Sequence, residues 1–118
     1  MANKEKEHRL VDFDGTLAVH KTEDGMSELG APVPKMLEQV KAWLTKGEKV
    51  KIFTARVNPK SHNQGEAAAD AQRKAIQAWC KKWIGSALEV TCMKDHLTKE
   101  VWDDKAVRVE KNRGERTK

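Results

Sequence analysis

Two pairs of aspartates stand at the ends of short apolar runs in this sequence. Asp12 and Asp14 end the first run, and Asp103 and Asp104 follow another run near the far end of the chain. Crowded carboxylates repel one another, and burial strengthens that repulsion, so a divalent cation is their natural neutraliser. Oxygen ligands of this kind favour Mg²⁺. If the fold brings the two pairs together, the sequence predicts a magnesium site at these four aspartates.

A hydroxyl and an amine follow two more apolar runs. Thr54 comes directly after the run Lys49–Phe53, and Lys94 lies just beyond the run Ala87–Met93. A phosphate bound to the cation would leave oxygens that the Thr54 hydroxyl and the Lys94 amine can bind. Thr54 could instead cap a loop, and Arg56 is either a further phosphate ligand or a surface residue. Together, these residue types predict a metal-dependent phosphoryl site.

The alternation of strand-sized and helical patterns predicts how the chain brings these groups together. Apolar positions at helical spacing predict one helix that Pro32 and Pro34 open and Gly47 ends, and a longer helix over Glu66–Ile84. The five strand-sized runs are Arg9–Phe13, Lys49–Phe53, Ala87–Met93, Glu100–Trp102 and Ala106–Val109. Strands that alternate with helices require crossovers and therefore pair in parallel. Ligands of such sheets bind at the carboxyl ends of the strands, where the aspartates, Thr54 and Lys94 lie.

The length of the chain sets the number of domains. With 118 residues, it has room for one core of a sheet and its helices, and none for a large inserted cap. We expect a single α/β domain over residues 1–118, with a Rossmann-like three-layer fold and a parallel sheet of about five strands. Residues 1–8 and 111–118 are mostly polar, and we expect them to be flexible tails.

The cysteines and the apolar runs indicate the cellular compartment of the protein. Cys80 and Cys92 have apolar neighbours and no C-x-x-C spacing, so we expect free, buried thiols. No apolar run is long enough to span a membrane, and Met1–Leu10 is charged where a signal peptide would be apolar. We expect a cytoplasmic protein without a membrane partner.

An excess of basic residues permits an anionic partner. The chain has 23 Lys and Arg against 18 Asp and Glu, a formal net charge of +5. Part of the excess lies in a tail that contains Lys111, Arg113, Arg116 and Lys118. This tail either contacts nucleic acid or is a solvated chain end.

The segment Asp12–Leu17 reads Asp-Phe-Asp-Gly-Thr-Leu and follows an apolar strand. It resembles the first motif of the haloacid dehalogenase-like (HAD) phosphohydrolases. The other motifs of that superfamily have counterparts in order along the chain: a strand ending in Thr54, then Lys94, then Asp103-Asp104 after Val101-Trp102. The resemblance spans Arg9 to about Val109. The stretch Leu88–Val109 is most similar to small HAD-like proteins of bacteria and their phages that lack a cap domain.

The resemblance implies roles for the residues of the first motif. Asp12 would be the nucleophile that accepts the phosphoryl group and, through its other oxygen, a metal ligand. Asp14 would be the general acid and base, and its backbone carbonyl would complete the metal shell. Gly15 would let the chain turn so that Asp14 reaches the leaving oxygen, and Gly15 and Thr16 would contact the substrate.

The remaining implied roles concern the phosphate and the metal. Thr54 would bond the phosphoryl oxygens, and Lys94 would pair with Asp12 and the transferred group. Asp103 and, directly or through water, Asp104 would hold Mg²⁺. Lys99 competes with Lys94 for the lysine role, because the spacing to the acidic pair varies in the superfamily.

These residues and the resemblance predict a Mg²⁺-dependent phosphatase that works through an aspartyl-phosphate on Asp12. Only Ala18–Gly30 and Asn58–Gly65 lie over the mouth of the site, and an open site suits large substrates such as phosphorylated nucleic-acid ends or proteins, although nucleotides also fit. The alternative is a non-catalytic phosphate- or nucleic-acid-binding module, or a phosphoacceptor similar to a response-regulator receiver. A receiver carries its phosphoacceptor aspartate after its third strand, where this sequence offers only Asp95.

Overall fold

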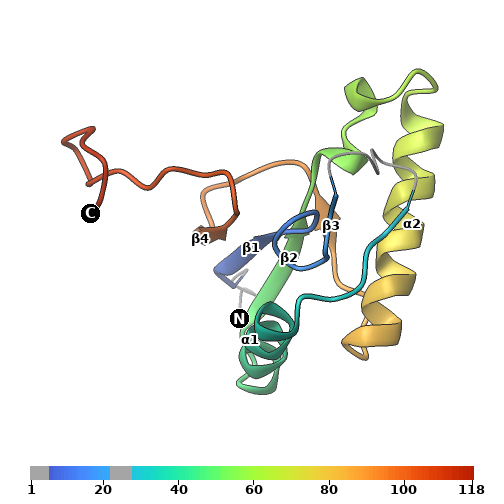
Figure 1. Cartoon of the computed structure of the whole chain (residues 1–118), viewed down its shortest axis with the longest axis horizontal. Coiled ribbons are helices and arrows are strands. Elements are labelled where there is room, and N and C mark those ends of the chain that lie inside the picture. Colours follow the sequence, from blue (N-terminus) through green and yellow to red (C-terminus); the bar gives the residue numbers. More distant parts are fainter. Residues whose placement is uncertain (1–5, 22–27) are drawn as a thin grey trace, which may run out of the picture.

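Four parallel strands form the sheet of the computed structural model, which describes residues 6–21 and 28–118 (Figure 1). They are β1 (His8–Asp12), β2 (Lys49–Phe53), β3 (Val90–Thr91) and β4 (Thr98–Trp102). The strands lie in the order β3-β2-β1-β4, and each neighbouring pair is parallel. The predicted α/β class with a parallel sheet is confirmed, and the described residues include no cap domain.

Two helices lie where the apolar spacing predicts them. The first, α1 (Pro34–Thr45), begins at a proline, whose missing N–H is not needed in a first turn, and it ends just before Gly47. The second, α2 (Glu66–Trp83), ends two residues before Gly85. Each helix buries an apolar stripe against the sheet. Among the described residues, no helix is long and apolar enough to cross a bilayer.

Both helices pack on the same face of the sheet. The Trp43 ring of α1 has its centroid 4.4 Å from the guanidinium carbon of Arg9. The Trp79 ring of α2 meets Phe13 edge-on, with ring centroids 4.9 Å apart. Arg9, Val11 and Phe13 are spaced two residues apart, so they face the same side of the chain as it passes through β1. The apolar core lies between the helices and this face of the sheet, and the end of β1 packs against it.

The connection between β3 and β4 crosses the opposite face, so the third layer is a chain segment and not a helix. His8 donates its backbone N–H to the Leu97 carbonyl at 3.0 Å, and its ring Nε2 lies 3.0 Å from the Thr98 hydroxyl. On β2, the Lys51 ammonium lies 3.8 Å from Asp95. His8 is 1% exposed and begins β1, so the first strand includes a residue of the expected N-terminal tail. Residues 1–5 of that tail lie outside the described residues.

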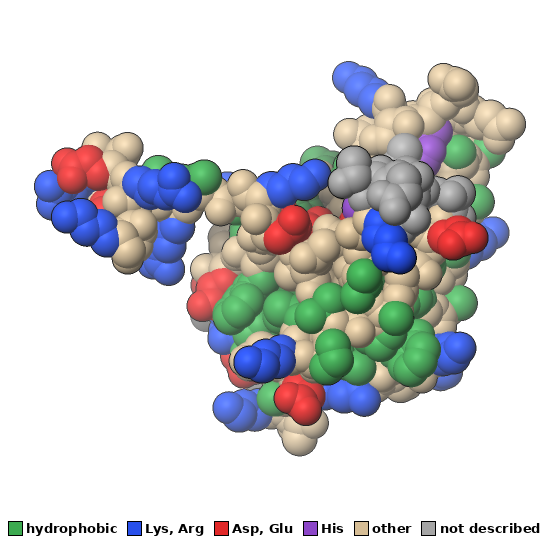
Figure 2. All heavy atoms as spheres, in the orientation of Figure 1, with side chains coloured by type: hydrophobic (Ala, Val, Ile, Leu, Met, Phe, Trp, Pro, Cys, Tyr) green, Lys and Arg blue, Asp and Glu red, His purple; other side chains and the backbone are tan. Residues whose placement is uncertain are grey.

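The last apolar run does not join the sheet. After β4 the chain leaves the carboxyl end of the sheet, and within Ala106–Val109 only Val109 forms a bridge, with Arg116. Positive φ angles at Asn112 (63°) and Gly114 (71°) let the chain reverse between these partners. The expected tail 111–118 is therefore the returning half of a turn. Residues 105–118, named here the C-terminal arm, lead away from the sheet (Figure 1) and carry Lys and Arg side chains (Figure 2).

The strand order brings the chemistry-bearing strand ends together. β1 has β2 on one side and β4 on the other, so the chain changes direction across the sheet at β1. Open α/β sheets bind ligands at such a switch point. Asp12 pairs with Phe53 across β1 and β2, so Thr54 lies one residue beyond Asp12 at the same edge of the sheet.

Candidate active site

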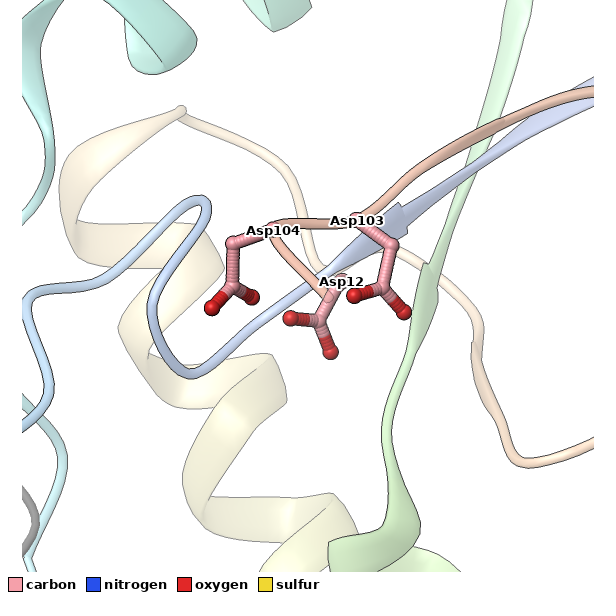
Figure 3. A group of neighbouring side chains, drawn as sticks. All are labelled: Asp12, Asp103 and Asp104. Atoms are coloured by element: carbon pink, nitrogen blue, oxygen red, sulfur yellow. The ribbon is translucent and has the colours of Figure 1, made fainter. Parts of the chain in front are cut away.

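Three carboxylates meet at the carboxyl ends of β1 and β4. Val11 pairs with Trp102, so the residues that follow them, Asp12 and Asp103, leave neighbouring strands side by side. One carboxylate oxygen from each of Asp12, Asp103 and Asp104 lies within 4.8 Å of the other two. Figure 3 shows the three groups gathered at the strand ends. The two acidic motifs thus come together through these three residues, which are named here the acidic cluster.

Burial and hydrogen bonding change the acidity of this cluster. Burial is the largest effect on Asp12 and, with the hydrogen bond to Asp104 and the charge of Asp103, it raises the pKa of Asp12 to about 7. Burial also acts to raise the pKa of Asp104, but hydrogen bonds from Asp12, Thr16 and the backbone outweigh it and hold that pKa below its ordinary value. Asp12 therefore keeps its proton to a higher pH than an ordinary aspartate, and its protonated form is hydrogen-bonded to Asp104. A cation bound to these oxygens would displace the proton.

The turn after β1 packs directly against the second acidic motif. The Thr16 hydroxyl lies 3.2 Å from Asp12 Oδ2 and 3.1 Å from Asp104 Oδ1, and it accepts the Asp104 backbone N–H at 3.0 Å. Gly15 has a φ of +87°, and a Cβ at this position would lie 2.9 Å from Asp104 Oδ2. Gly15 lines the cavity described below, whereas Thr16 does not. The role that this geometry gives Thr16 is to join the two acidic motifs.

Asp14 pairs with Arg56 and contributes no side-chain oxygen to the acidic cluster. Arg56 Nε lies 2.6 Å from Asp14 Oδ2, and its Nη2 lies 2.9 Å from Oδ1, which makes a bidentate pair. Arg56 is 1% exposed, and it also donates to Gln72 Oε1 at 3.0 Å and to the Glu28 carbonyl at 2.9 Å. Nδ1 of His20 lies 3.5 Å from Asp14 Oδ1. Arg56 is therefore buried, and its N–H groups already donate to the Asp14 carboxylate, the Gln72 side chain and the Glu28 carbonyl. It is neither a surface residue nor a guanidinium that is open to a phosphate.

Thr54 precedes the short 3₁₀ turn η2 (Ala55–Val57) at the end of β2. Its hydroxyl oxygen accepts the Arg56 backbone N–H at 3.1 Å, so Thr54 caps this turn. It is 5% exposed and lines the cavity. A hydroxyl that accepts one hydrogen bond can still donate its own proton. The two interpretations of Thr54, as a loop cap and as a donor to a phosphate, are therefore compatible.

One cavity of about 620 Å³ opens above these groups. Among the residues that the sequence singles out, its lining includes Asp12, Asp14, Gly15, Thr54, Arg56, Asp103 and Asp104. His20 and Asn58 also line it, from the two segments that the sequence places over the mouth of the site. Cys92 lines it too, although both cysteines were expected to be buried. That expectation is confirmed for Cys80, where burial raises the thiol pKa to about 11.

The lysine beside the cavity is Lys105. Lys94 is exposed and does not line the cavity, and Lys99 binds Glu48 Oε1 at 3.2 Å near the amino end of β4. Lys105 lines the cavity, and its backbone N–H donates to Asp103 Oδ1 at 2.8 Å. The resemblance points to a lysine that precedes the acidic pair. Lys105 follows the pair, so it is not among the residues predicted from the sequence. The signal that could have found it is its position directly after a strand-end aspartate.

The acidic cluster fits a hard divalent cation. All its donors are carboxylate oxygens, from Asp12 and Asp103, which are partly buried, and from Asp104, which is exposed. Within the described ranges, no Lys, Arg or His forms an ion pair with these three carboxylates. Oxygen donors without nitrogen or sulfur favour Mg²⁺ or Ca²⁺ over transition metals. Asp12, Asp103 and Asp104 could thus hold the cation, while the Asp14 carboxylate is paired with Arg56.

Comparisons with known proteins bear on the fold. No family model matches the sequence, and no curated protein matches it. The structure is similar to the solved structure of a conserved protein from Bacteroides thetaiotaomicron, with a TM-score of 0.58 and 16% sequence identity. The match covers 87% of this chain and 79% of that chain. At this identity the similarity shows a shared fold alone.

Proposed function

We propose that the protein is a Mg²⁺-dependent phosphomonoester hydrolase that works through an aspartyl-phosphate on Asp12. The observation that carries this proposal is the convergence of Asp12, Asp103 and Asp104 within 4.8 Å at a cavity that Thr54 and Lys105 also line. The resemblance of residues 12–17 to the first motif of the HAD-like phosphohydrolases supports the same assignment.

Asp12 is the group that attacks phosphorus in this proposal. It is the last residue of β1, and Thr16 lies within hydrogen-bonding distance of its carboxylate, so its position is set by the strand and the turn. An aspartate is a weak nucleophile, and a phosphate dianion repels it. Bound Mg²⁺ would supply the positive charge that offsets this repulsion. With a pKa of about 7, Asp12 must lose its proton before its oxygen can form the bond to phosphorus.

Asp14 is the general acid and general base in this proposal. It lines the same cavity as Asp12, and the bidentate contact with Arg56 fixes the direction of its carboxyl group. In the first step the protonated form of Asp14 gives its proton to the ester oxygen as the bond from that oxygen to phosphorus breaks, and the carboxylate that remains is paired with Arg56. In the second step it takes a proton from the water that attacks the aspartyl-phosphate. The net reaction turns a phosphate monoester and water into an alcohol and inorganic phosphate, and Arg56 acts as a positioning residue.

Thr54 and Lys105 bind the oxygens of the transferred group. The Thr54 hydroxyl can donate a hydrogen bond, and the Lys105 ammonium supplies a positive charge at the edge of the cavity. Both groups come from strand ends, Thr54 after β2 and Lys105 three residues after β4. They therefore flank the phosphate from the two sides of β1.

Hydrolysis of nitrophenyl phosphate tests the proposal. We expect turnover with Mg²⁺ and none with EDTA, and inhibition by Ca²⁺, whose larger and looser coordination shell would misplace the Asp12 oxygen. Asp12→Asn should abolish turnover and keep the circular dichroism spectrum, because the amide does not attack phosphorus. Substantial turnover by a folded Asp12→Asn protein would contradict the mechanism. Phosphate binding by the wild-type protein without turnover would favour a non-catalytic module.

The proton role of Asp14 has a separate test. Nitrophenolate leaves readily without a proton, whereas an alkoxide does not, so Asp14→Asn should lower kcat/KM more for an alkyl phosphate than for nitrophenyl phosphate. Because the second step also slows, the phosphoryl group should remain on Asp12 long enough for mass spectrometry after an acid quench. Equal losses for both substrates without a trapped intermediate would remove the acid and base role from Asp14.

A further inference from the structure

A second cavity adjoins the acidic cluster on the outer side of β4. It has a volume of about 620 Å³ and lies between β4, which is an edge strand of the sheet, and the start of the C-terminal arm. We name it the β4 groove, and the lining residues used below are Glu100, Trp102, Asp103 and Arg108. Asp103 lines both cavities, so the groove and the acidic cluster are neighbours at this residue.

The C-terminal arm brings positive charge to this groove through Arg108. The Glu100 carboxylate is occupied by Arg9, whose Nε lies 2.5 Å from Oε1. Arg108 faces no carboxylate within 4.0 Å in the described part of the chain, and it lines the groove from the arm. The arm contains six Lys and Arg and two Glu, so it accounts for four of the five net positive charges of the whole chain. Figure 2 shows these cations on the arm, apart from the body of the molecule.

Trp102 gives the groove an aromatic surface. Its side chain is 38% exposed. Its ring packs edge-on against Trp43 with centroids 5.1 Å apart, and its Nε1 donates to Glu100 Oε1 at 3.2 Å. These two contacts fix the indole before any ligand arrives, so stacking a base on it would cost little ordering entropy.

We infer that the β4 groove and the C-terminal arm bind single-stranded nucleic acid whose terminal phosphate lies at the acidic cluster. The role of the terminal phosphate rests on the proposed phosphatase function. An unpaired base would stack on Trp102, and the next backbone phosphates would pair with Arg108 and with cations further along the arm, such as Lys111. An acidic protein would match the charge of the arm but offers no base for the indole. A duplex would keep its bases stacked on each other and away from Trp102.

Fluorescence anisotropy with a labelled thymidine 12-mer that has no terminal phosphate measures this binding without any turnover. The test variant is Arg108→Gln/Lys111→Gln in the full-length chain, and the matched control is Lys74→Gln/Lys81→Gln, which removes the same charge from exposed positions on α2. We expect the Kd to rise about tenfold in the arm variant. Because each phosphate contact to a single strand contributes about 0.7 to the slope of log K against log salt, that slope should fall by about 1.4. The control variant should stay within about twofold of wild type.

A second variant pair tests the stacking surface. Trp102→Leu should raise the Kd about fivefold or more, whereas Trp83→Leu should leave it unchanged. Trp83 is the matched control because it is 37% exposed, like Trp102, and lies on α2. Thermal unfolding of each variant identifies any loss of binding that comes from misfolding, and the exposed arm variant keeps the test decisive if Trp102→Leu does not fold.

Several outcomes would overturn the inference. Equal Kd values for the arm variant and its control would show that the arm does not bind the strand. Equally tight binding of a glutamate peptide of the same charge, unaffected by Trp102→Leu, would show a general polyanion surface. A change from dimer to monomer by light scattering in the arm variant, with unchanged binding of the 12-mer, would assign the groove to a second copy of this chain. If nitrophenyl phosphate is not hydrolysed but the arm and Trp102 effects appear, the proposed function fails and the binding site stands.

Discussion

Asp12 is a single carboxyl group on which three influences act together. Burial at the end of β1, the hydrogen bond to Asp104 and the charge of Asp103 all favour its protonated form. The same three features make its oxygens good ligands for a cation, since removing the proton leaves a crowded negative charge that only a cation offsets. In the proposed function, the acidity of Asp12 is thus coupled to metal binding.

This coupling predicts a pH-dependent stability in EDTA. The pKa of Asp12 is raised from an ordinary value of 3.8 to about 7, so between these two values the folded protein holds more protons than the unfolded chain. Its free energy of unfolding therefore falls as the pH rises through that window. Asp12→Asn removes this effect, so thermal unfolding should show a Tm above wild type by on the order of 5 °C at pH 8 and no such gain at pH 4. Equal pH dependence in the two proteins would contradict the raised pKa.

The choice between lysines gives a second prediction at the residue scale. Lys105 lines the cavity and Lys94 does not. In the proposed function, Lys105→Gln should therefore lower kcat/KM for nitrophenyl phosphate about tenfold or more, because it removes a charge that would stabilise the transferred group. Lys94→Gln should change kcat/KM by less than about twofold. The reverse order of effects would restore Lys94 as the catalytic lysine.

The residues at strand ends could be predicted, and the pair between Asp14 and Arg56 could not. Asp12, Thr54 and Asp103 each follow an apolar run, and parallel strands carry such residues to one edge. Asp14 and Arg56 are 42 positions apart. Their contact depends on how η2 turns after β2 and on where α2 places Gln72, and no local pattern encodes either.

At the scale of elements, the turn after β1 decides whether the acidic cluster forms. Gly15 has a φ of +87° and lies against the Asp104 carboxylate, so it meets both a backbone and a packing requirement. Gly47 has a similar φ of +81° after α1, but a Cβ there would meet nothing within 4 Å. Comparing substitutions at these two glycines therefore distinguishes the effect of backbone strain from the effect of contact with the Asp104 carboxylate.

Alanine at these two glycines should give different results. Each substitution places a side chain at a positive φ and should lower the free energy of unfolding by about 1–2 kcal/mol. Gly15→Ala should also lower turnover about tenfold or more, because its Cβ would push Asp104 out of the cluster. Gly47→Ala should keep wild-type kcat/KM, measured with nitrophenyl phosphate alongside urea unfolding. Normal turnover in a folded Gly15→Ala protein would show that the cluster tolerates this displacement.

The elements themselves were predictable to different degrees. Both helices follow a clear apolar period, so their positions agree closely with the sequence. β3 is only Val90–Thr91, because it pairs with β2 over just two residues. The run Ala106–Val109 alternates like a strand but has no neighbour to pair with in the sheet, since the chain has already left the carboxyl end of β4. Alternation indicates the ability to form a strand, and pairing also needs an open edge within reach.

At the scale of the whole molecule, charge is divided unevenly between the body and the C-terminal arm. Residues 107–118 hold five Lys and Arg and two Glu, so without them the net charge falls from +5 to +2. These residues also bury little apolar surface, since Val107 and Val109 are 56% and 53% exposed. The arm thus adds charge to the molecule without adding to its core.

A chain that ends after Ala106 should therefore keep its fold and lose its affinity for single strands. Residues 107–116 are all exposed, and the bridge between Val109 and Arg116 lies within the arm, so removing them takes away little buried area. The Tm by circular dichroism should stay within about 2 °C of the full chain. Binding of the thymidine 12-mer should weaken about tenfold or more, because the cations beyond Lys105 are gone. A large fall in Tm would show that the arm packs on the body in solution, and retained affinity would show that the body alone attracts the strand.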